Sequence, residues 1–224
     1  MHVLIAGAGK LATELLDQLA QGSPFNVWPW SGAPDAGARA IVVHAGSGRE
    51  MGEIERFCRR TSSVLVELAT GSSMEGQQPG FPVVLCPNTN ILMLKFICML
   101  ERAGPLFAGS RISITESHQA SKVSVPGSAV AMAHALGVAA SGVRSVRSAS
   151  EQATELGIPT EHLARHAYHR IEIHEGPCTI AMETRVYGES PYASGLRQLI
   201  VAIQQRPLQT RVYGVNEFIE NGWV

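Results

Sequence analysis

The stretch HVLIAGAGKLATELLDQLAQG, residues 2–22, decides the fold of the first part of the chain. Its opening residues, 2–6, form an apolar run that is typical of a strand covered on both faces. From residue 11 onward, apolar side chains recur at helical spacing until Gly22, a residue that commonly ends helices. The stretch therefore predicts a strand, a glycine-rich turn and a helix in immediate succession.

The turn between strand and helix has the spacing GxGxxA. Gly7 permits the tight turn, Gly9 lets the backbone approach a pyrophosphate, and Ala12 keeps helix and strand close together. The free N–H groups of the helix N-terminus would face the phosphates. We expect a dinucleotide here, the alternative being a purely structural turn. The expected cofactor-binding residues are Gly7, Ala8, Gly9, Lys10, Leu11 and Ala12.

The sequence leaves open whether the dinucleotide is NADH or NADPH. NAD specificity usually places an acidic residue at the end of the second strand, where it binds the ribose. That region reads WPWSGAP, residues 28–34, with no acid before Asp35 and no arginine before Arg39. Lys10 could reach a 2′-phosphate from the glycine turn, which favours NADPH.

Alternating strands and helices continue to residue 88. A short strand is expected within residues 25–30, and a crossover helix over residues 50–60. Buried strands are expected within residues 38–46, 62–70 and 81–87. This alternation predicts an α/β fold with a doubly wound parallel sheet. We assign residues 1–88 to a dinucleotide-binding domain, on which residues 207–224 pack back.

Residues 89–206 have a different pattern and are assigned to a smaller α+β domain. A strand is expected over residues 110–117, and residues 169–188 alternate with period two around a Glu-Gly-Pro turn, which predicts a hairpin. Helices are expected over residues 91–104, 127–140 and 193–205. Apolar residues that can share one face of the hairpin are Ile171, Ile173, Cys178, Ile180, Met182 and Val186.

The composition excludes several classes of protein. A net charge of −1 over 224 residues gives no electrostatic footprint for nucleic acid or an anionic membrane. The four cysteines form no CxxC pair, so neither a zinc site nor a disulfide framework is predicted. The longest apolar run contains Lys95 and is too short for a bilayer, and residues 1–11 lack a signal-peptide pattern. We expect a cytoplasmic protein without nucleic-acid or membrane partners.

The stretch ESHQASKVSVPGSA, residues 116–129, holds one of only three lysines in a chain with 15 arginines. An ammonium can donate a proton, whereas a guanidinium cannot. His118 and Lys122 are therefore candidate proton donors beside a hydride acceptor, the alternative being a solvated loop. Gly127 and Ser128 open a helix and could bind a substrate carboxylate, although Ser128 could equally be an ordinary N-cap.

Two other patterns are weaker. His162, His166 and His169 lie at i, i+4 and i+7 of a candidate helix over residues 160–170, which resembles a metal cluster. No acidic or cysteine pattern accompanies them, so we predict no metal site. Cys86 has no histidine near it in sequence and is interpreted as core packing.

Several segments resemble, in order, the dihydrodipicolinate reductase family. The most specific is ESHQASKVSVPGSAVAMA, which resembles the family signature Glu-Ala-His-His-x-x-Lys-x-Asp-Ala-Pro-Ser-Gly-Thr-Ala. The others are VLIAGAGKLATELL (3–16), VELATG (66–71), PVVLCPNTNILMLK (82–95), SPYASGLRQLIVAI (190–203) and VYGVNEFIENG (212–222). The resemblance covers most of the chain.

The resemblance implies a Rossmann domain followed by a domain for substrate binding and oligomerisation, in a homotetramer. It implies NAD(P)H-dependent reduction of a cyclic imine-conjugated carboxylate in lysine and diaminopimelate biosynthesis. His118 and Lys122 then match the proton-donating residues, and Gln119, Gly127 and Ser128 match the substrate-binding residues. The cofactor-facing loops match Ala69, Thr70, Cys86, Pro87, Asn88 and Thr89.

The chain departs from the family pattern around the substrate. Gln119 replaces the second signature histidine, and Thr184 and Glu189 stand where a histidine and an arginine are usual. Ser124-Val125 replaces Asp-Ala, and residues 148–166 have no counterpart. A glutamine carries no positive charge, so a dianionic substrate should bind less well.

Two further functions remain open. One is a divergent reductase of another imine or keto acid, and the other is a non-catalytic dinucleotide-binding sensor. A short-chain dehydrogenase is excluded, because no Tyr-x-x-x-Lys occurs among the three lysines.

Overall fold

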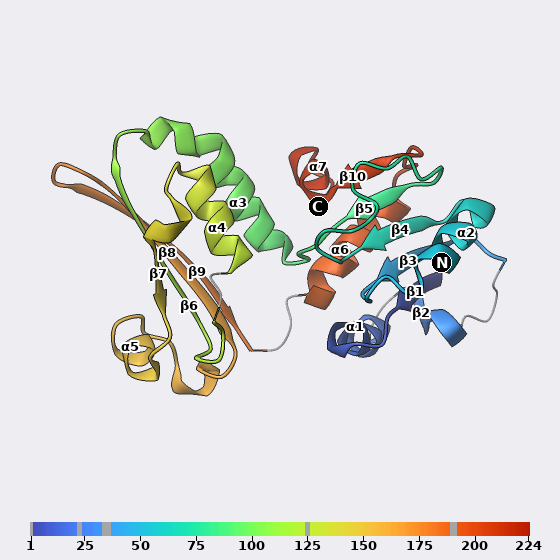
Figure 1. The fold of residues 1–224 in the computed structure, drawn as a ribbon, viewed down its shortest axis with the longest axis horizontal. Helices are drawn as coiled ribbons and strands as arrows, with labels where there is room; N and C mark the ends of the chain where they lie inside the picture. Colours follow the sequence, from blue (N-terminus) through green and yellow to red (C-terminus); the bar gives the residue numbers. More distant parts are fainter. Residues whose placement is uncertain (1, 22–23, 33–36, 124–125, 189–191) are drawn as a thin grey trace. The chain divides into compact units, whose positions relative to one another are not determined.

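The computed structural model describes residues 2–21, 24–32, 37–123, 126–188 and 192–224. The chain forms two compact units, one of residues 1–91 with 191–224 and one of residues 92–190. Figure 1 shows a separate sheet in each unit.

The first unit contains a six-stranded parallel sheet in the order β10-β5-β4-β3-β1-β2. The strands are β1 (His2–Ala6), β2 (Asn26–Pro29), β3 (Ala40–His44), β4 (Val64–Glu67), β5 (Val83–Leu85) and β10 (Val212–Gly214). The last of these comes from the C-terminal segment and pairs with β5. The expected α/β fold with a parallel sheet is confirmed.

Helices complete this unit, and the central strands β1, β3 and β4 are buried on both faces of the sheet. The helices are α1 (Lys10–Ala20), α2 (Met51–Thr61), α6 (Tyr192–Gln204) and α7 (Val215–Glu220), with a 3₁₀ turn η1 (Trp30–Gly32). Leu4, Val42 and Leu65 lie side by side in register and pack with residues of α2. Neighbouring residues such as Ile5 and Val43 point to the opposite face and are equally buried.

The position of α6 differs from the sequence-based assignment, which placed residues 193–205 in the second domain. The helix belongs to the first unit, where it packs against α1. A Cβ atom at Gly195 would lie 1.7 Å from the carbonyl oxygen of Thr89, so the helix backbone touches the turn after β5. An amphipathic pattern identifies such a helix but not the sheet on which it packs.

The second unit contains a four-stranded sheet in the order β7-β6-β8-β9. Its strands are β6 (Arg111–His118), β7 (Val143–Val146), β8 (His166–Glu175) and β9 (Cys178–Tyr187). The first two pair in parallel, whereas β6 with β8 and β8 with β9 pair antiparallel. The predicted hairpin is therefore confirmed, although Cys178 and Ile180 near its tip are exposed.

Helices α3 (Ile91–Ala103) and α4 (Gly127–Ala135) cover one face of this sheet (Figure 1). Leu100 and Met132 from the helices pack with Ile114 and Ile171 from the strands. Shorter elements are α5 (Ala149–Thr154) and the 3₁₀ turns η2 (Gly104–Phe107), η3 (Ala140–Gly142) and η4 (Thr160–His162). In the described ranges, no helix has the length and apolar character needed to cross a bilayer.

Two sequence-based predictions were wrong in this unit. Residues 160–170 are not a helix, because β8 begins at His166 and pairs on both sides within the sheet. The helix expected over residues 127–140 ends at Ala135, since Gly137 has φ +68° and turns the chain.

The close approach at Gly195 gives a first testable prediction. We expect Gly195→Ala to lower the free energy of unfolding by about 3 kcal/mol, because its Cβ would overlap the Thr89 carbonyl. The matched control is Gly52→Ala in α2, where the nearest atom that a Cβ would meet, Nη1 of Arg56, lies 3.9 Å away. This control should be neutral or stabilising by up to about 1 kcal/mol.

Urea unfolding followed by tryptophan fluorescence measures both effects, because Trp28, Trp30 and Trp223 all lie in the first unit. Equal stabilities of the two variants would contradict the proposed contact.

Candidate active site

The glycine turn after β1 is shaped by a close backbone contact. Gly7 has φ +129°, and a Cβ atom on it would lie 2.5 Å from the carbonyl oxygen of Ala45. The Ala45 N–H donates to the Ala6 carbonyl at 2.7 Å, which brings the loop after β3 against the turn. Both the dihedral angle and the crowding require glycine at this position.

Gly9 requires a different explanation, because a Cβ atom there would meet nothing within 4 Å. It is the N-cap of α1, makes no side-chain capping bond, and is followed by no acidic residue in the first helical turn. The helix N-terminus thus keeps open space beside N–H groups that no side chain caps. These features fit the anionic pyrophosphate of a dinucleotide.

The other expected cofactor residues lie at the carboxyl ends of β4 and β5, which meet at the same edge of the parallel sheet as the glycine turn. Ala69 is half-buried and Thr70 exposed. Cys86 and Thr89 are buried, so only their backbone could contact a ligand. Burial also raises the pKa of the Cys86 thiol to about 12, in keeping with its interpretation as core packing. Pro87 is exposed and Asn88 half-buried.

In the second unit, four polar residues form one row across the sheet. Glu116 on β6 lies opposite Ser145 on β7 and His169 on β8, and His169 lies opposite Thr184 on β9. The row borders the apolar core formed by the same strands with α3 and α4. His118 is the last residue of β6, not a loop residue as expected, and shares this face with Glu116.

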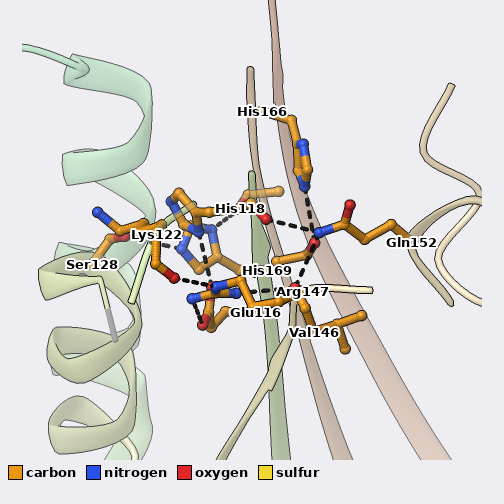
Figure 2. A network of polar contacts seen from close by, with 11 residues as sticks. Glu116, His118, Lys122, Ser128, Val146, Arg147, Gln152, His166 and His169 are labelled. Carbon is orange, nitrogen blue, oxygen red and sulfur yellow. Dashed lines mark hydrogen bonds and ion pairs between the residues drawn. The ribbon is translucent and has the colours of Figure 1, made fainter. Parts of the chain in front are cut away.

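Glu116 is the centre of the polar network in Figure 2. Its carboxylate, which has no exposed surface, lies 2.8 Å from His118 Nδ1 and accepts bonds of 2.6 and 3.2 Å from the Arg147 guanidinium. Burial opposes its ionisation, but hydrogen bonds from His118, Arg147 and Ser145 outweigh this and lower the pKa of Glu116 to about 2. The carboxylate is therefore ionised at neutral pH.

The ionised carboxylate determines how the His118 ring is oriented. A carboxylate can only accept hydrogen bonds, so Nδ1 of His118 must donate. The Nε2 atom is then the nitrogen left for proton exchange with a ligand. The His118 side chain is 12% exposed, so the ring is held but still reachable.

Arg147 and Gln152 hold the backbone on which the candidate catalytic residues lie. Arg147 Nε donates to the Lys122 carbonyl at 2.8 Å, and Gln152 Nε2 donates to the His118 carbonyl at 2.8 Å. Sequence reasoning missed both residues and Glu116, and it considered His169 only as a metal ligand. Arg147 lies 25 positions from Lys122, and Gln152 lies 34 positions from His118, so no local motif signals these contacts.

His169 is buried between two hydroxyl groups. Its Nε2 lies 2.9 Å from Ser128 Oγ, and its Nδ1 lies 2.9 Å from Thr184 Oγ1. Burial, with a smaller contribution from the nearby His118, lowers the pKa of His169 to about 4. His169 is therefore neutral at pH 7 and meets the His118 ring edge to face, with centroids 5.8 Å apart.

The remaining expected substrate residues lie close to this cluster in the chain. Lys122 closes a turn in which its N–H donates to the Gln119 carbonyl at 2.9 Å. In Figure 2 the Ser128 hydroxyl is joined to the His169 ring, and the Lys122 carbonyl is joined to Arg147. Gly127 begins α4 at an N-terminus without a side-chain cap. Ser124 and Val125 lie outside the described residues, as do Asp35 and Glu189.

The histidines considered as a metal cluster do not form one. His166 faces the other side of the sheet, where its Nε2 lies 2.9 Å from Ser117 Oγ and its Nδ1 donates to the His162 carbonyl. Burial lowers the pKa of His166 as well. In the described part of the chain, no group of three histidine, cysteine or acidic side chains could hold a metal ion.

The structure thus defines a two-unit chain: a parallel α/β unit with a dinucleotide-type glycine turn, and a mixed-sheet unit with a His–Lys cluster. No protein-family model matches the chain. Among curated proteins, it is 36% identical to "Probable 4-hydroxy-tetrahydrodipicolinate reductase 1, chloroplastic" of Oryza sativa subsp. japonica, over 50% of the chain and 36% of the relative. It is 28% identical to "4-hydroxy-tetrahydrodipicolinate reductase 2, chloroplastic" of Arabidopsis thaliana, over 62% of the chain and 44% of the relative.

The chain therefore spans less than half the length of the curated relatives it matches. Among solved structures, it superposes on a dipicolinate-bound dihydrodipicolinate reductase from Paenisporosarcina sp. TG-14 with a TM-score of 0.68 and 15% identity, covering 96% of this chain and 97% of that one. A DAP dehydrogenase of C. glutamicum gives a TM-score of 0.51 and 10% identity over 96% and 92%. These matches confirm the resemblance noted in the sequence, and the structural ones confirm the fold.

The buried carboxylate gives a second prediction, on pH dependence. Because the folded-state pKa of Glu116 is lowered from 4.5 to about 2, its contribution to stability is present above about pH 5 and is lost as the pH falls toward 2. We expect Glu116→Gln to be less stable than wild type by about 3 kcal/mol at pH 7, with the difference shrinking toward pH 2.

Urea unfolding between pH 2.5 and 7, followed by circular dichroism, measures this difference. Glu172→Gln is a control for a carboxylate that is only partly buried, and its effect should be small at every pH. A Glu116→Gln difference that does not change with pH would contradict the assignment.

Proposed function

We propose that the chain is an NAD(P)H-dependent reductase of the dihydrodipicolinate reductase type. The reaction is reduction of a cyclic imine-conjugated carboxylate in lysine and diaminopimelate biosynthesis. The observation that carries the proposal is the orientation of His118, whose Nδ1 is committed to Glu116 while Nε2 is left for a ligand. Lys122 and the N-terminus of α4 come from the same short segment, which matches the family signature.

The residues of the second unit would bind the substrate and supply the proton. A reduced nicotinamide dinucleotide, when bound, supplies the hydride. The Ser128 hydroxyl and the first N–H groups of α4 bind a substrate carboxylate, and Gln119 can donate a further hydrogen bond. His118 Nε2 or the Lys122 ammonium gives the proton that completes the addition of hydride and proton across one double bond.

A divergent substrate is the second candidate, favoured by the low positive charge of this cluster. His169 is neutral at pH 7, and Gln119 and Thr184 carry no charge. A carboxylate here would be bound by hydroxyl and N–H donors more than by cations. Another imine or keto acid with fewer negative charges therefore remains a candidate substrate, and a non-catalytic sensor is the outcome if no substrate turns over.

The proposal includes the setting of the enzyme. We propose NADPH as the preferred cofactor, a homo-oligomer (a tetramer by resemblance) and a cytoplasmic location, with no nucleic-acid or membrane partner. The exposed Lys10 at the start of α1 supports the choice of NADPH, because its ammonium can reach a 2′-phosphate.

The third prediction concerns Lys122. We expect Lys122→Ala to lower kcat by roughly 10²–10³-fold, since it removes a proton donor. The dissociation constant of NADPH should stay unchanged. The assay is NADPH oxidation with freshly generated 4-hydroxy-tetrahydrodipicolinate, and Lys95→Ala is the matched control, because Lys95 is exposed on α3 and carries the same charge.

Equal turnover in wild type and Lys122→Ala would contradict the role of Lys122. A wild-type protein that binds NADPH but does not turn over this substrate would direct the search to the less charged substrates.

The fourth prediction separates the two cofactors. We expect Lys10→Ala to weaken NADPH binding about fivefold, in line with the loss of one exposed charge contact of about 1 kcal/mol, and to leave NADH binding unchanged. Quenching of tryptophan fluorescence or calorimetry measures both affinities. An equal effect on NADH and NADPH would show that Lys10 does not contact a 2′-phosphate.

A further inference from the structure

A buried histidine–glutamate pair lies at the carboxyl edge of the parallel sheet and belongs to no expected site. His44 is the last residue of β3 and Glu67 the last of β4, and they are register partners. Their side chains are 1% and 0% exposed. His44 Nδ1 lies 2.9 Å from both carboxylate oxygens of Glu67.

Each end of the pair binds the backbone of a loop. The Ala69 N–H donates to Glu67 Oε1 at 2.7 Å, and the Gly48 N–H donates to His44 Nε2 at 3.3 Å. Because Nε2 accepts this bond, the imidazole carries its proton on Nδ1 and donates it to the carboxylate. The pair thus connects the loop after β3 with the loop after β4.

The loop after β3 also packs directly against the glycine turn. A Cβ atom on Gly7 would lie 2.5 Å from the Ala45 carbonyl oxygen and 3.0 Å from the Gly46 nitrogen. A Cβ atom on Gly46 would lie 3.0 Å from His44 Nε2 and 3.3 Å from Gly7 Cα. The imidazole, the loop and the turn are therefore in close packing, so a shift of the ring would move the turn.

Stability alone does not explain this pair. Replacing both partners of a buried hydrogen-bonded pair by apolar residues of similar shape can leave stability unchanged or raise it. What such hydrogen bonds do is fix the position of the groups they join. A buried donor or acceptor that loses its partner is costly, so the joined segments are held in the arrangement that keeps the bonds. The pair binds one N–H in each of two loops at the expected cofactor edge.

We propose that His44 and Glu67 are positioning residues for dinucleotide binding. They hold the loops at residues 45–48 and 68–70 in the arrangement that supports the Gly7 turn, and thereby set the affinity for the cofactor. This inference rests on the proposed function, because it takes the glycine turn as the dinucleotide site.

The test is the dissociation constant of NADPH for the full chain, measured by calorimetry together with the Tm. In the double variant His44→Leu/Glu67→Leu, we expect NADPH binding to weaken by on the order of tenfold. Losing hydrogen bonds that orient the ligand-binding groups costs roughly ten- to a hundredfold in affinity at metal sites, and we expect the lower end of that range here. The Tm should stay the same or rise. Unchanged affinity, or weaker binding that accompanies a fall in Tm, would overturn the inference.

A near-isosteric variant, Glu67→Gln, covers the case in which the double variant does not fold. The Ala69 N–H fixes the amide oxygen at the Oε1 position, so the amide N–H₂ takes the Oε2 position. There a donor replaces an acceptor 2.9 Å from the donating His44 Nδ1, which displaces the ring. Binding should again weaken while the fold is kept. If Glu67→Gln bound NADPH with the affinity of the wild type, the inference would be overturned.

A control variant separates stability from positioning. Val64→Ala removes buried volume at the other end of β4, so it should lower the Tm and leave the NADPH affinity unchanged. A wild-type protein that binds neither NADPH nor NADH would overturn the proposed function and this inference together. Binding in wild type with equal affinity in all variants would overturn the inference alone.

Discussion

A carboxylate withdrawn from water needs hydrogen-bond donors for its oxygens, and both units of this chain depend on that requirement. Among the described residues, Glu67 and Glu116 are the two acidic side chains that are buried. Each lies at or near the end of a strand and is paired with Nδ1 of a histidine. The partners differ, because Glu116 also binds Arg147, whereas Glu67 also binds a backbone N–H. The first arrangement leaves Nε2 of a histidine for a ligand, and the second commits it to a loop.

Local sequence patterns predicted the elements that carry these groups. Apolar runs identified β1, β3, β4 and β5, because a strand buried on both faces needs apolar side chains at nearly every position. The GxGxxA spacing identified the turn at Gly7, because backbone crowding and a positive φ leave glycine as the residue that fits. Arg147 and Gln152 could not be found in this way. Their partners lie 31 and 34 positions away, and β6–β7 pairing brings them together.

The three histidines show why spacing alone misleads. Residues three or four apart share one face of a helix, but residues three apart point to opposite faces of a strand. His166 and His169 are three apart in β8, so one contacts Ser117 on one face and the other contacts Ser128 on the opposite face. A candidate metal cluster on a helix thus becomes two unrelated contacts on a strand. The secondary structure, which the short segment did not specify, decides the chemistry.

Charge in the second unit follows from the same burial. Arg147 is engaged with Glu116, so its positive charge balances the buried carboxylate. His169 is kept neutral by burial between two hydroxyl groups. Lys122, whose N–H donates to the Gln119 carbonyl, is a further cation of the segment that follows His118. A site of this kind can protonate a substrate and bind one carboxylate through neutral donors, but it offers little to a second carboxylate. The network that orients His118 therefore also leaves little net positive charge in this cluster.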